Sequence, residues 1–294
     1  MSTVPAASTV SSTVRTAFNF NILKAPLCTM DGWQTPHFGL FNSVSKANIG
    51  QTVSKDYVPH TTDDVIALTE AAQHAFDSDV SIDCHFDKGH YVKIQPNKDY
   101  RKSVYGTNDN VYPRILINAS LNGRAFRATM GWYRDLCMNM SMMTKVKGTS
   151  VSIRHMSNLR GDMDSLIATF NTLKESWGSL EAVIDSMQAQ EVNLASFLDA
   201  VYGEPTAQEG RGLTIHRNRT EEIMRRVQSE RLRSGRPTLQ PGVFTVSGWE
   251  AYNAVQGFAQ HKASRNGDPN SFGRIVAASS DRYVKKAEEL VLAM

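Results

Sequence analysis

The hydrophobic periodicity of the chain changes near residue 160, and this change constrains the fold more than any other feature of the sequence. Before it, Val80–Phe86 alternates between apolar and polar residues, and an Asp-Lys-Gly turn signal separates it from a partner segment at Tyr91–Ile94. Tyr112–Ala119 likewise leads through Leu121-Asn122-Gly123 into a return segment at Arg124–Tyr133. Alternation predicts half-buried strands, and Asn-Gly is a strong hairpin signal.

Helical spacing appears once early and then dominates the second half. A Thr-Thr-Asp-Asp run at 61–64 precedes apolar residues at helical intervals through Phe76, which predicts one early helix. From Asp162 onward the spacing is mostly helical, and two final helices are expected over Trp249–Ala263 and Ser271–Leu292. We therefore predict an α+β fold with antiparallel β-sheet and hairpins, one early helix and a mostly helical C-terminal half.

A chain of 294 residues is long enough for one large domain or two smaller ones. We expect an N-terminal arm over 1–41, partly disordered or in contact with a neighbouring subunit. Residues 42–160 are expected to form an α+β core with a basic hairpin, and 161–294 a helical region.

Cysteine usage and hydropathy favour a cytoplasmic protein. The three cysteines are far apart and form no Cys-x-x-Cys pair, which fits reduced thiols better than a disulfide framework or a thiolate zinc site. Met1–Val14 has no basic start and no apolar run, so we do not expect it to be a signal peptide. No segment approaches the roughly 18 consecutive apolar residues of a membrane span, and no membrane partner is expected.

The formal net charge of +3 hides a strong separation of charge along the chain. Val111–Arg160 holds eight basic residues and one acid, a net of +7. Gly161–Gly210 holds nine acids and one lysine, a net of −8, and Arg211–Arg236 holds eight arginines and three glutamates, a net of +5. The first block lacks local acids, and arginine and lysine bind phosphates, so it is the better candidate for a nucleic-acid-binding face.

The candidate site residues come from this first block. We expect three arginines to contact phosphates, four further basic residues to flank the groove, and two aromatic residues to stack on bases. The phosphate contacts are expected from Arg124, Arg127 and Arg134. The flanking basic residues are Lys145, Lys147, Arg154 and Arg160, and the stacking residues are Trp132 and Tyr133.

Each basic block has an alternative interpretation. The arginines of the first block could pair with the acidic helices that follow, or simply solvate the sheet. The basic helix at 219–233 carries Glu222 three and four residues before Arg225 and Arg226, and Glu221 four before Arg225. Such pairs stabilise a solvated helix without any ligand, so binding of nucleic acid or of an acidic partner is only one of two explanations.

Catalytic and metal-site patterns are weak. Asp83, His85 and Asp87 share one strand face, with His90 across the turn, which could hold a divalent ion or could be the polar face of a hairpin. The chain has no phosphate-binding glycine loop, no dinucleotide-binding fingerprint and no His-Glu-x-x-His motif. We therefore expect a non-enzymatic protein without catalytic residues, bound metal or cofactor.

Several short segments resemble a phage/plasmid-like protein family of unknown function. They are Val53–Pro59 (the family's VSKxYxP); Asn118, Gly123, Arg134, Cys137 and Asn139 (its hairpin and Cys-x-Asn signature); Ser152–His155 (its RxH segment); and Asn253–Val255 with His261 (its C-terminal NAV helix). The resemblance runs from about Asn42 to about Ala263. Gln256 stands where the family usually has threonine, and the hairpin lacks the family's His-Asp-Gly tripeptide.

The resemblance implies a protein carried by phages or plasmids in bacterial hosts. The order of elements is also similar, in topology alone, to single-strand annealing proteins of the Redβ/RecT type, which bind the DNA backbone without a cofactor and form rings or filaments. Our leading hypothesis is a homo-oligomeric phage or mobile-element protein that binds single-stranded DNA and could mediate recombination by strand annealing. The alternative is a structural or host-interaction protein without nucleic-acid affinity.

Overall fold

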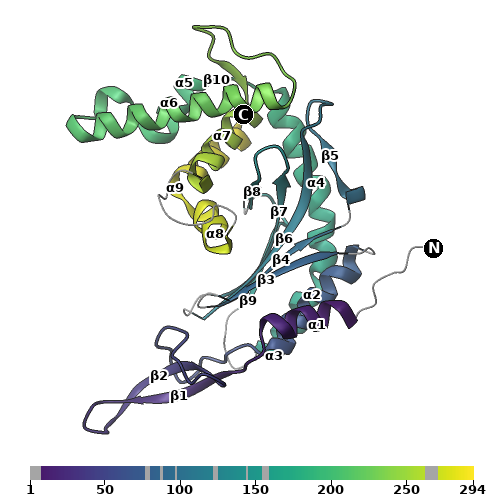
Figure 1. The fold of residues 1–294 in the computed structure, drawn as a ribbon, viewed down its shortest axis with the longest axis vertical. Helices are drawn as coiled ribbons and strands as arrows, with labels where there is room; N and C mark the ends of the chain where they lie inside the picture. The colour runs from purple at the N-terminus through teal and green to yellow at the C-terminus, as the bar shows by residue number, and fades with distance from the viewer. Residues whose placement is uncertain are drawn as a thin grey trace. The chain divides into compact units, whose positions relative to one another are not determined.

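The computed structural model describes residues 8–76, 80–86, 89–96, 98–121, 125–143, 145–153, 159–261 and 271–294 (Figure 1). The α-helices are α1 Ser8–Ala17, α2 Thr62–Phe76, α3 Leu159–Ala168, α4 Phe170–Ala189, α5 Leu194–Tyr202, α6 Gly210–Arg233, α7 Gly248–His261, α8 Phe272–Ser280 and α9 Arg282–Ala293. The strands are β1 Ile22–Cys28, β2 Gln34–Asn42, β3 Ser81–Phe86, β4 Gly89–Gln95, β5 Lys102–Ser103, β6 Asn110–Ser120, β7 Phe126–Arg134, β8 Asn139–Ser141, β9 Ser150–Ile153, β10 Glu191–Asn193 and β11 Thr245–Ser247. Antiparallel strands, an early helix and a helical C-terminal half confirm the predicted fold class.

The chain forms two compact units, each assembled from three segments. Unit 1 comprises Met1–Tyr100, Pro113–Gly131 and Lys147–Trp177, and unit 2 comprises Arg101–Tyr112, Trp132–Val146 and Gly178–Met294. The sequence predicted a division near residue 160. Periodicity marks where strands give way to helices, but it does not show that the long strands β6 and β7 each supply residues to both units.

Unit 1 contains an antiparallel sheet with helices on one face. β3 pairs with β4, with Ser81 opposite Gln95, and β4 pairs with β6, with Val92 opposite Ile117. β9 runs along the start of β7. α1 packs on α2 and β3, and α2 packs on β4, so the strands bury their apolar side chains against these helices. The hairpin predicted over Val80–Ile94 and the helix predicted after Thr61 are therefore both confirmed.

The segment expected to be an arm contains α1 and the β1–β2 hairpin. Figure 1 shows this hairpin extending away from the other strands of unit 1. Its base is fixed, because Leu40 packs with Val53, Tyr57 and Leu121 in a buried cluster. Lys24 reinforces the attachment, since its ammonium donates to the backbone carbonyl oxygens of Lys55 at 2.6 Å and Tyr57 at 2.8 Å.

Unit 2 is organised around α7, whose residues from Gly248 to Gly257 are all buried. α6, α8, α9 and β8 pack against it. The methionine-rich run of the sequence supplies β8: Gln256 donates to the Met140 carbonyl at 2.8 Å, and Gln260 accepts from the Met140 N–H at 3.0 Å. Side chains of α7 thus bond to the backbone of a short strand.

The helix predicted over Ser271–Leu292 is two helices, α8 and α9. The chain leaves helical geometry at Asp281, which has a φ of −64° and a ψ of 133°. The Asp281 carboxylate accepts hydrogen bonds from the N–H groups of Tyr283 at 2.8 Å and Val284 at 3.3 Å, so it caps α9. The apolar spacing continues across this break, which is why periodicity alone merged the two helices.

A histidine pair lies in the core of unit 1. His60 Nε2 is 2.7 Å from His90 Nδ1, and both side chains are buried. The Phe18 ring meets the His90 ring edge-on at 4.4 Å, and Phe126 meets His60 in the same way at 5.4 Å. Burial lowers the pKa of His90 from its ordinary value to about 4.

We predict that unit 1 loses stability in mild acid through His90. The unfolded chain binds a proton near the ordinary histidine pKa and the folded chain only near pH 4, so the stabilisation is complete above about pH 6.5 and is lost as the pH falls toward 4. Urea titrations should show this contribution falling by roughly 2–3 kcal/mol between about pH 7.5 and about pH 4.5. His90→Asn should lose that part of the pH dependence, while His85→Asn, at an exposed position, should keep it. Equal pH dependence in the wild type and His90→Asn would contradict the prediction.

Candidate nucleic-acid interface

The sheet of unit 1 has a second face, opposite the helices, and this face is polar. Successive side chains of a strand point to opposite sides, so Ile82, Cys84 and Phe86 turn toward the core, and Ser81, Asp83 and His85 turn away from it. On β4 the side chains of His90, Val92 and Ile94 are buried in the core, which leaves Tyr91 and Lys93 on the other face. We call this second side the outer face of the sheet.

Basic and aromatic side chains are spread over several strands of the outer face. Tyr91 of β4 lies opposite His85 on β3 and Asn118 on β6. Lys93 lies opposite Leu116, and Arg114, two residues earlier on β6, has the same orientation as Leu116. The strand register therefore places two cations and one tyrosine side by side on neighbouring strands.

Arg127 adds a third cation to the outer face. Its neighbours Phe126 and Ala128 are fully buried, and Phe126 contacts the His60 ring in the core, so Arg127 points the other way. It lies opposite Ser152 on β9 and is exposed. Lys147, just before β9, is also exposed. Neither Arg127 nor Lys147 has an acidic partner within the described part of the chain.

Acidic residues reduce the charge of the outer face only locally. Asp83 forms an ion pair with Lys93 at 2.8 Å, and the Asp83 side chain is 57% exposed. The pair is open to solvent on the Asp83 side, so it contributes little energy, and its partners can exchange. Lys93 and Arg114 each take part in further interactions, whereas the side chains of Arg127 and Lys147 are exposed.

Not all predicted site residues can be placed. Arg124 and Arg154 lie outside the described residues, and Arg160 lies at the start of α3 with a side chain that the structure does not describe. Tyr133 is half-buried in unit 2. Lys145, also in unit 2, forms an ion pair with Glu289, and its backbone N–H donates to Glu288 at 3.1 Å. Lys145 therefore has an acidic partner, but Glu289 belongs to α9 and not to the acidic segment at 161–210.

Trp132 and Arg134 do not present their side chains to solvent, so we remove both from the predicted binding set. Trp132 is fully buried, with its ring 5.5 Å from the Trp249 ring and 6.1 Å from the Tyr252 ring. Arg134 is 3% exposed. The alternation of side chains along β7 indicates this burial. Trp132 and Arg134 are at even positions, like the buried Phe126, Ala128 and Met130, whereas Arg127 and Tyr133 are at odd positions.

Arg134 is instead the centre of a buried ionic network in unit 2. Its Nε donates to both Asp109 carboxylate oxygens at 2.9 Å, and its Nη2 donates to Asp109 Oδ2 at 2.6 Å. Its Nη1 donates to Glu230 of α6. Burial alone would lower the pKa of the guanidinium, but the Cys137 sulfur and the carboxylates of Glu230 and Asp109 together outweigh burial and raise that pKa well above its ordinary value, so Arg134 stays charged.

The network extends from α6 to α7. Arg226 donates to Glu230 at 3.0 Å and to the Asn139 amide oxygen at 3.3 Å. Asn139 donates to the Asn253 carbonyl at 3.1 Å, and its oxygen lies 3.0 Å from His261 Nε2. Arg134 and the partly buried Arg226 balance the charges of the two buried acids, Asp109 and Glu230.

Cys137 lies beside this network but is not an activated nucleophile. Its sulfur accepts from Arg134 Nη1 at 3.6 Å. Burial raises the pKa of the thiol to about 11, despite the opposing effect of Arg134. A thiol with this pKa is protonated near neutral pH, whereas nucleophilic cysteines are thiolates.

The metal site considered for Asp83, His85 and His90 is not assembled. His90 lies opposite Phe86 and points into the core, so it is on the other side of the sheet from Asp83 and His85. Asp87 lies outside the described residues. No group of three or more histidine, cysteine, aspartate or glutamate side chains that could hold a metal ion is found among the residues that the structure describes.

The basic helix is α6, and much of its positive charge is used inside unit 2. Glu222 and Arg225 form the predicted pair at 2.9 Å. Arg219 lies over the rings of Tyr202 and Tyr283, 4.5 and 4.9 Å from their centres. Arg231 donates to Glu250 of α7 at 3.1 Å. These contacts support a structural role for most of the second basic block.

The sequence model of a family described as "Domain of unknown function (DUF932)" matches residues 51–291. The chain belongs to this family. The match starts after Asn42, where the expected phage/plasmid-like resemblance begins, and continues past the end of that resemblance near Ala263. The DUF932 domain includes β3 to β11 and all of α6 and α7. No curated protein and no solved structure matched the chain. Within the described part of the DUF932 domain, no helix is both long and apolar enough to span a membrane.

We predict that Arg134 is essential for the stability of the DUF932 domain. Arg134→Leu leaves Asp109 and Glu230 buried without their cation, which should lower the free energy of unfolding by about 3–5 kcal/mol. The matched control is Arg225→Leu on α6, where the side chain is 72% exposed and pairs with Glu222. That change should cost about 0.5 kcal/mol or less. Denaturant unfolding of the three proteins measures the difference, and equal stability of both variants would refute the role of the buried network.

Proposed function

We propose that the protein binds single-stranded DNA along the outer face of the unit 1 sheet. In this proposal it is a cofactor-independent protein of a phage or mobile element. It acts in the bacterial cytoplasm and supports recombination by holding strands for annealing. The outer face supports the proposal, because it gathers Lys93, Arg114, Arg127 and Tyr91 on adjoining strands opposite the helix-packed side.

The chemistry of this face suits a single strand. Single-strand-binding proteins combine a basic surface that follows the phosphates with aromatic rings on which bases stack. Arg127 and Lys147 are the exposed cations of unit 1 best able to reach phosphates, and Tyr91 is the candidate for stacking. His85 and Asn118, which flank Tyr91 on the adjacent strands, can donate hydrogen bonds to a sugar or a base edge. Such a face would show little sequence preference and a strong dependence on salt.

A structural or host-interaction role without nucleic-acid affinity remains the second candidate. The observation in its favour is that Arg134 and Lys145 of the first basic block pair with Glu230 and Glu289 of the C-terminal helices. Arg226 and Arg231 of the second block are likewise engaged with acids. The two candidates therefore differ in what they predict for Arg127 and Lys147.

We predict that the double variant Arg127→Ala/Lys147→Ala binds a single-stranded oligonucleotide several-fold more weakly than the wild type at low salt. Each lost phosphate contact should also reduce the slope of log affinity against log salt by about 0.7. Fluorescence anisotropy over a salt series measures both quantities.

The control is Arg15→Ala/Arg225→Ala, which removes two exposed arginines that pair with Asp63 and Glu222. It changes the net charge by the same amount, so it should retain both affinity and slope. Equal losses in the two double variants would show that binding follows net charge and not the outer face. Absence of binding by the wild type at low salt would favour the second candidate.

A further inference from the structure

The tip of the β1–β2 hairpin exposes a large apolar surface on a well-defined turn. Met30 is 106% exposed and Trp33 is 76% exposed. The turn is closed by hydrogen bonds from the Thr29 N–H to the Trp33 carbonyl at 2.8 Å and from the Gly32 N–H to the Thr29 carbonyl at 3.0 Å. Gly32 has a φ of +83°, which suits glycine at this position. Exposed tryptophan is a common anchor of protein interfaces.

Unit 2 contains an apolar cavity of about 310 Å³ between α5 and α6. Leu198 of α5 and Leu213 and Met224 of α6 line it, and Leu213 is itself 43% exposed. Arg217 and His216 supply polar groups to the same cavity. A cavity of this kind, mostly apolar with a few convergent polar groups, is typical of a binding site.

His216 carries a buried nitrogen without a partner. The side chain is 6% exposed, and its Nε2 makes no hydrogen bond within the described residues. The closest carboxylate oxygen, Asp199 Oδ1, is 3.8 Å away, beyond hydrogen-bond distance. A buried polar atom without a partner costs free energy, and a ligand that supplies the missing hydrogen bond recovers that cost.

Arg217 is available at the rim of the cavity. Its side chain is 69% exposed, and its ion pair with Glu221 is long, at 4.0 Å. An exposed i,i+4 pair of this length contributes little. Arg217 can therefore turn to an incoming carboxylate without a large loss.

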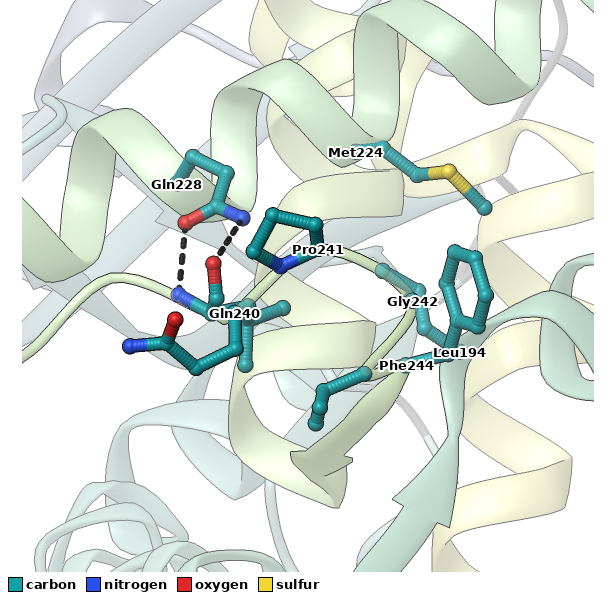
Figure 2. A pocket seen from close by; sticks show the side chains of 9 residues that line it. Leu194, Met224, Gln228, Gln240, Pro241, Gly242 and Phe244 are labelled. Atoms are coloured by element: carbon teal, nitrogen blue, oxygen red, sulfur yellow. Dashed lines mark hydrogen bonds between the residues drawn. The ribbon is translucent and has the colours of Figure 1, made fainter.

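Met224 also lines a second cavity, whose lining side chains Figure 2 shows. It measures about 220 Å³, and Pro241, Gly242 and Phe244 form part of its wall. Gln228 fixes this loop, since its side chain accepts from the Leu239 N–H at 2.8 Å and donates to the Leu239 carbonyl at 3.2 Å. None of the described residues that line this second cavity is charged, so the cavity with His216 and Arg217 is the more selective of the two.

We propose that the cavity between α5 and α6 receives the hairpin tip of a second copy of the chain. The Trp33 ring fills the apolar part, and its indole N–H donates to His216 Nε2. Asp31, exposed two residues before Trp33, pairs with Arg217 at the rim. The three groups of the tip thus match the three features of the cavity: apolar volume, an unpaired nitrogen and a cation.

This contact has a definite consequence for assembly. The hairpin tip and the cavity are different surfaces of one chain, so each copy offers one of each to its neighbours. We infer that the contact passes from copy to copy, which builds rings or open filaments; reciprocal exchange between two copies would instead close a two-fold dimer, and a wild type that stops at a dimer would contradict the head-to-tail form. The inference concerns assembly and does not depend on nucleic-acid binding.

Sedimentation velocity of the full chain over a range of concentrations tests the proposal. The wild type should form species larger than a dimer, whereas Trp33→Ala and Arg217→Glu should each sediment as monomers. The two variants mixed in equal amounts should form a dimer and stop there, because only one tip and one cavity in the mixture remain intact. Asp31→Arg combined with Arg217→Asp should restore assembly by exchanging the charges.

The matched control is Val44→Ala, which removes another exposed apolar side chain of unit 1 that is 72% exposed. It should assemble as the wild type does. A monomeric wild type, or unchanged assembly of both Trp33→Ala and Arg217→Glu, would overturn the proposal. Monomeric variants whose mixture also stays monomeric would overturn it too, because that result means the tip does not enter the cavity of another copy.

Discussion

The buried pairing of Arg134 with Asp109 and Glu230 determines how unit 2 is organised. A guanidinium removed from water must be matched by carboxylates in good geometry, and here it bonds two of them. Asp109 precedes β6, Arg134 ends β7 and Glu230 belongs to α6, so one side chain joins three elements distant in the sequence. Arg226 offsets the second negative charge and carries the connection on to Asn139.

This network changes the meaning of the charge separation along the chain. The two basic blocks look alike in sequence, but the structure assigns them different tasks. In α6, Arg226 and Arg231 hold the helix against α7 and β8, and Arg219 packs between two tyrosines. In unit 1, Arg127 and Lys147 remain accessible. A net charge computed over a segment therefore overstates how many of its cations can reach a ligand.

The fold class, the early helix and the first hairpin were predictable from the sequence, because each depends on local periodicity and turn residues. The partners of Arg134 were not, since Glu230 is 96 positions away and no local rule connects them. The burial of Trp132 and Arg134 is, by contrast, predictable from the sequence. Their even positions in β7 follow those of Phe126, Ala128 and Met130, and strand alternation alone places all five on one face. The residue types suggested a nucleic-acid interface, but the parity of the strand decides which of them can belong to it.

Binding through the outer face and assembly through the hairpin tip both determine how tightly the protein could hold a strand. A single outer face offers few accessible cations, and isolated phosphate contacts in water are weak and screened by salt. Head-to-tail assembly would repeat the face once per copy, so a strand held by one copy meets the next at high effective concentration. Affinity would then grow with the number of copies along the strand, without any further cation in the chain. A modestly basic protein of +3 could in this way hold a long polyanion that it would bind poorly as a monomer.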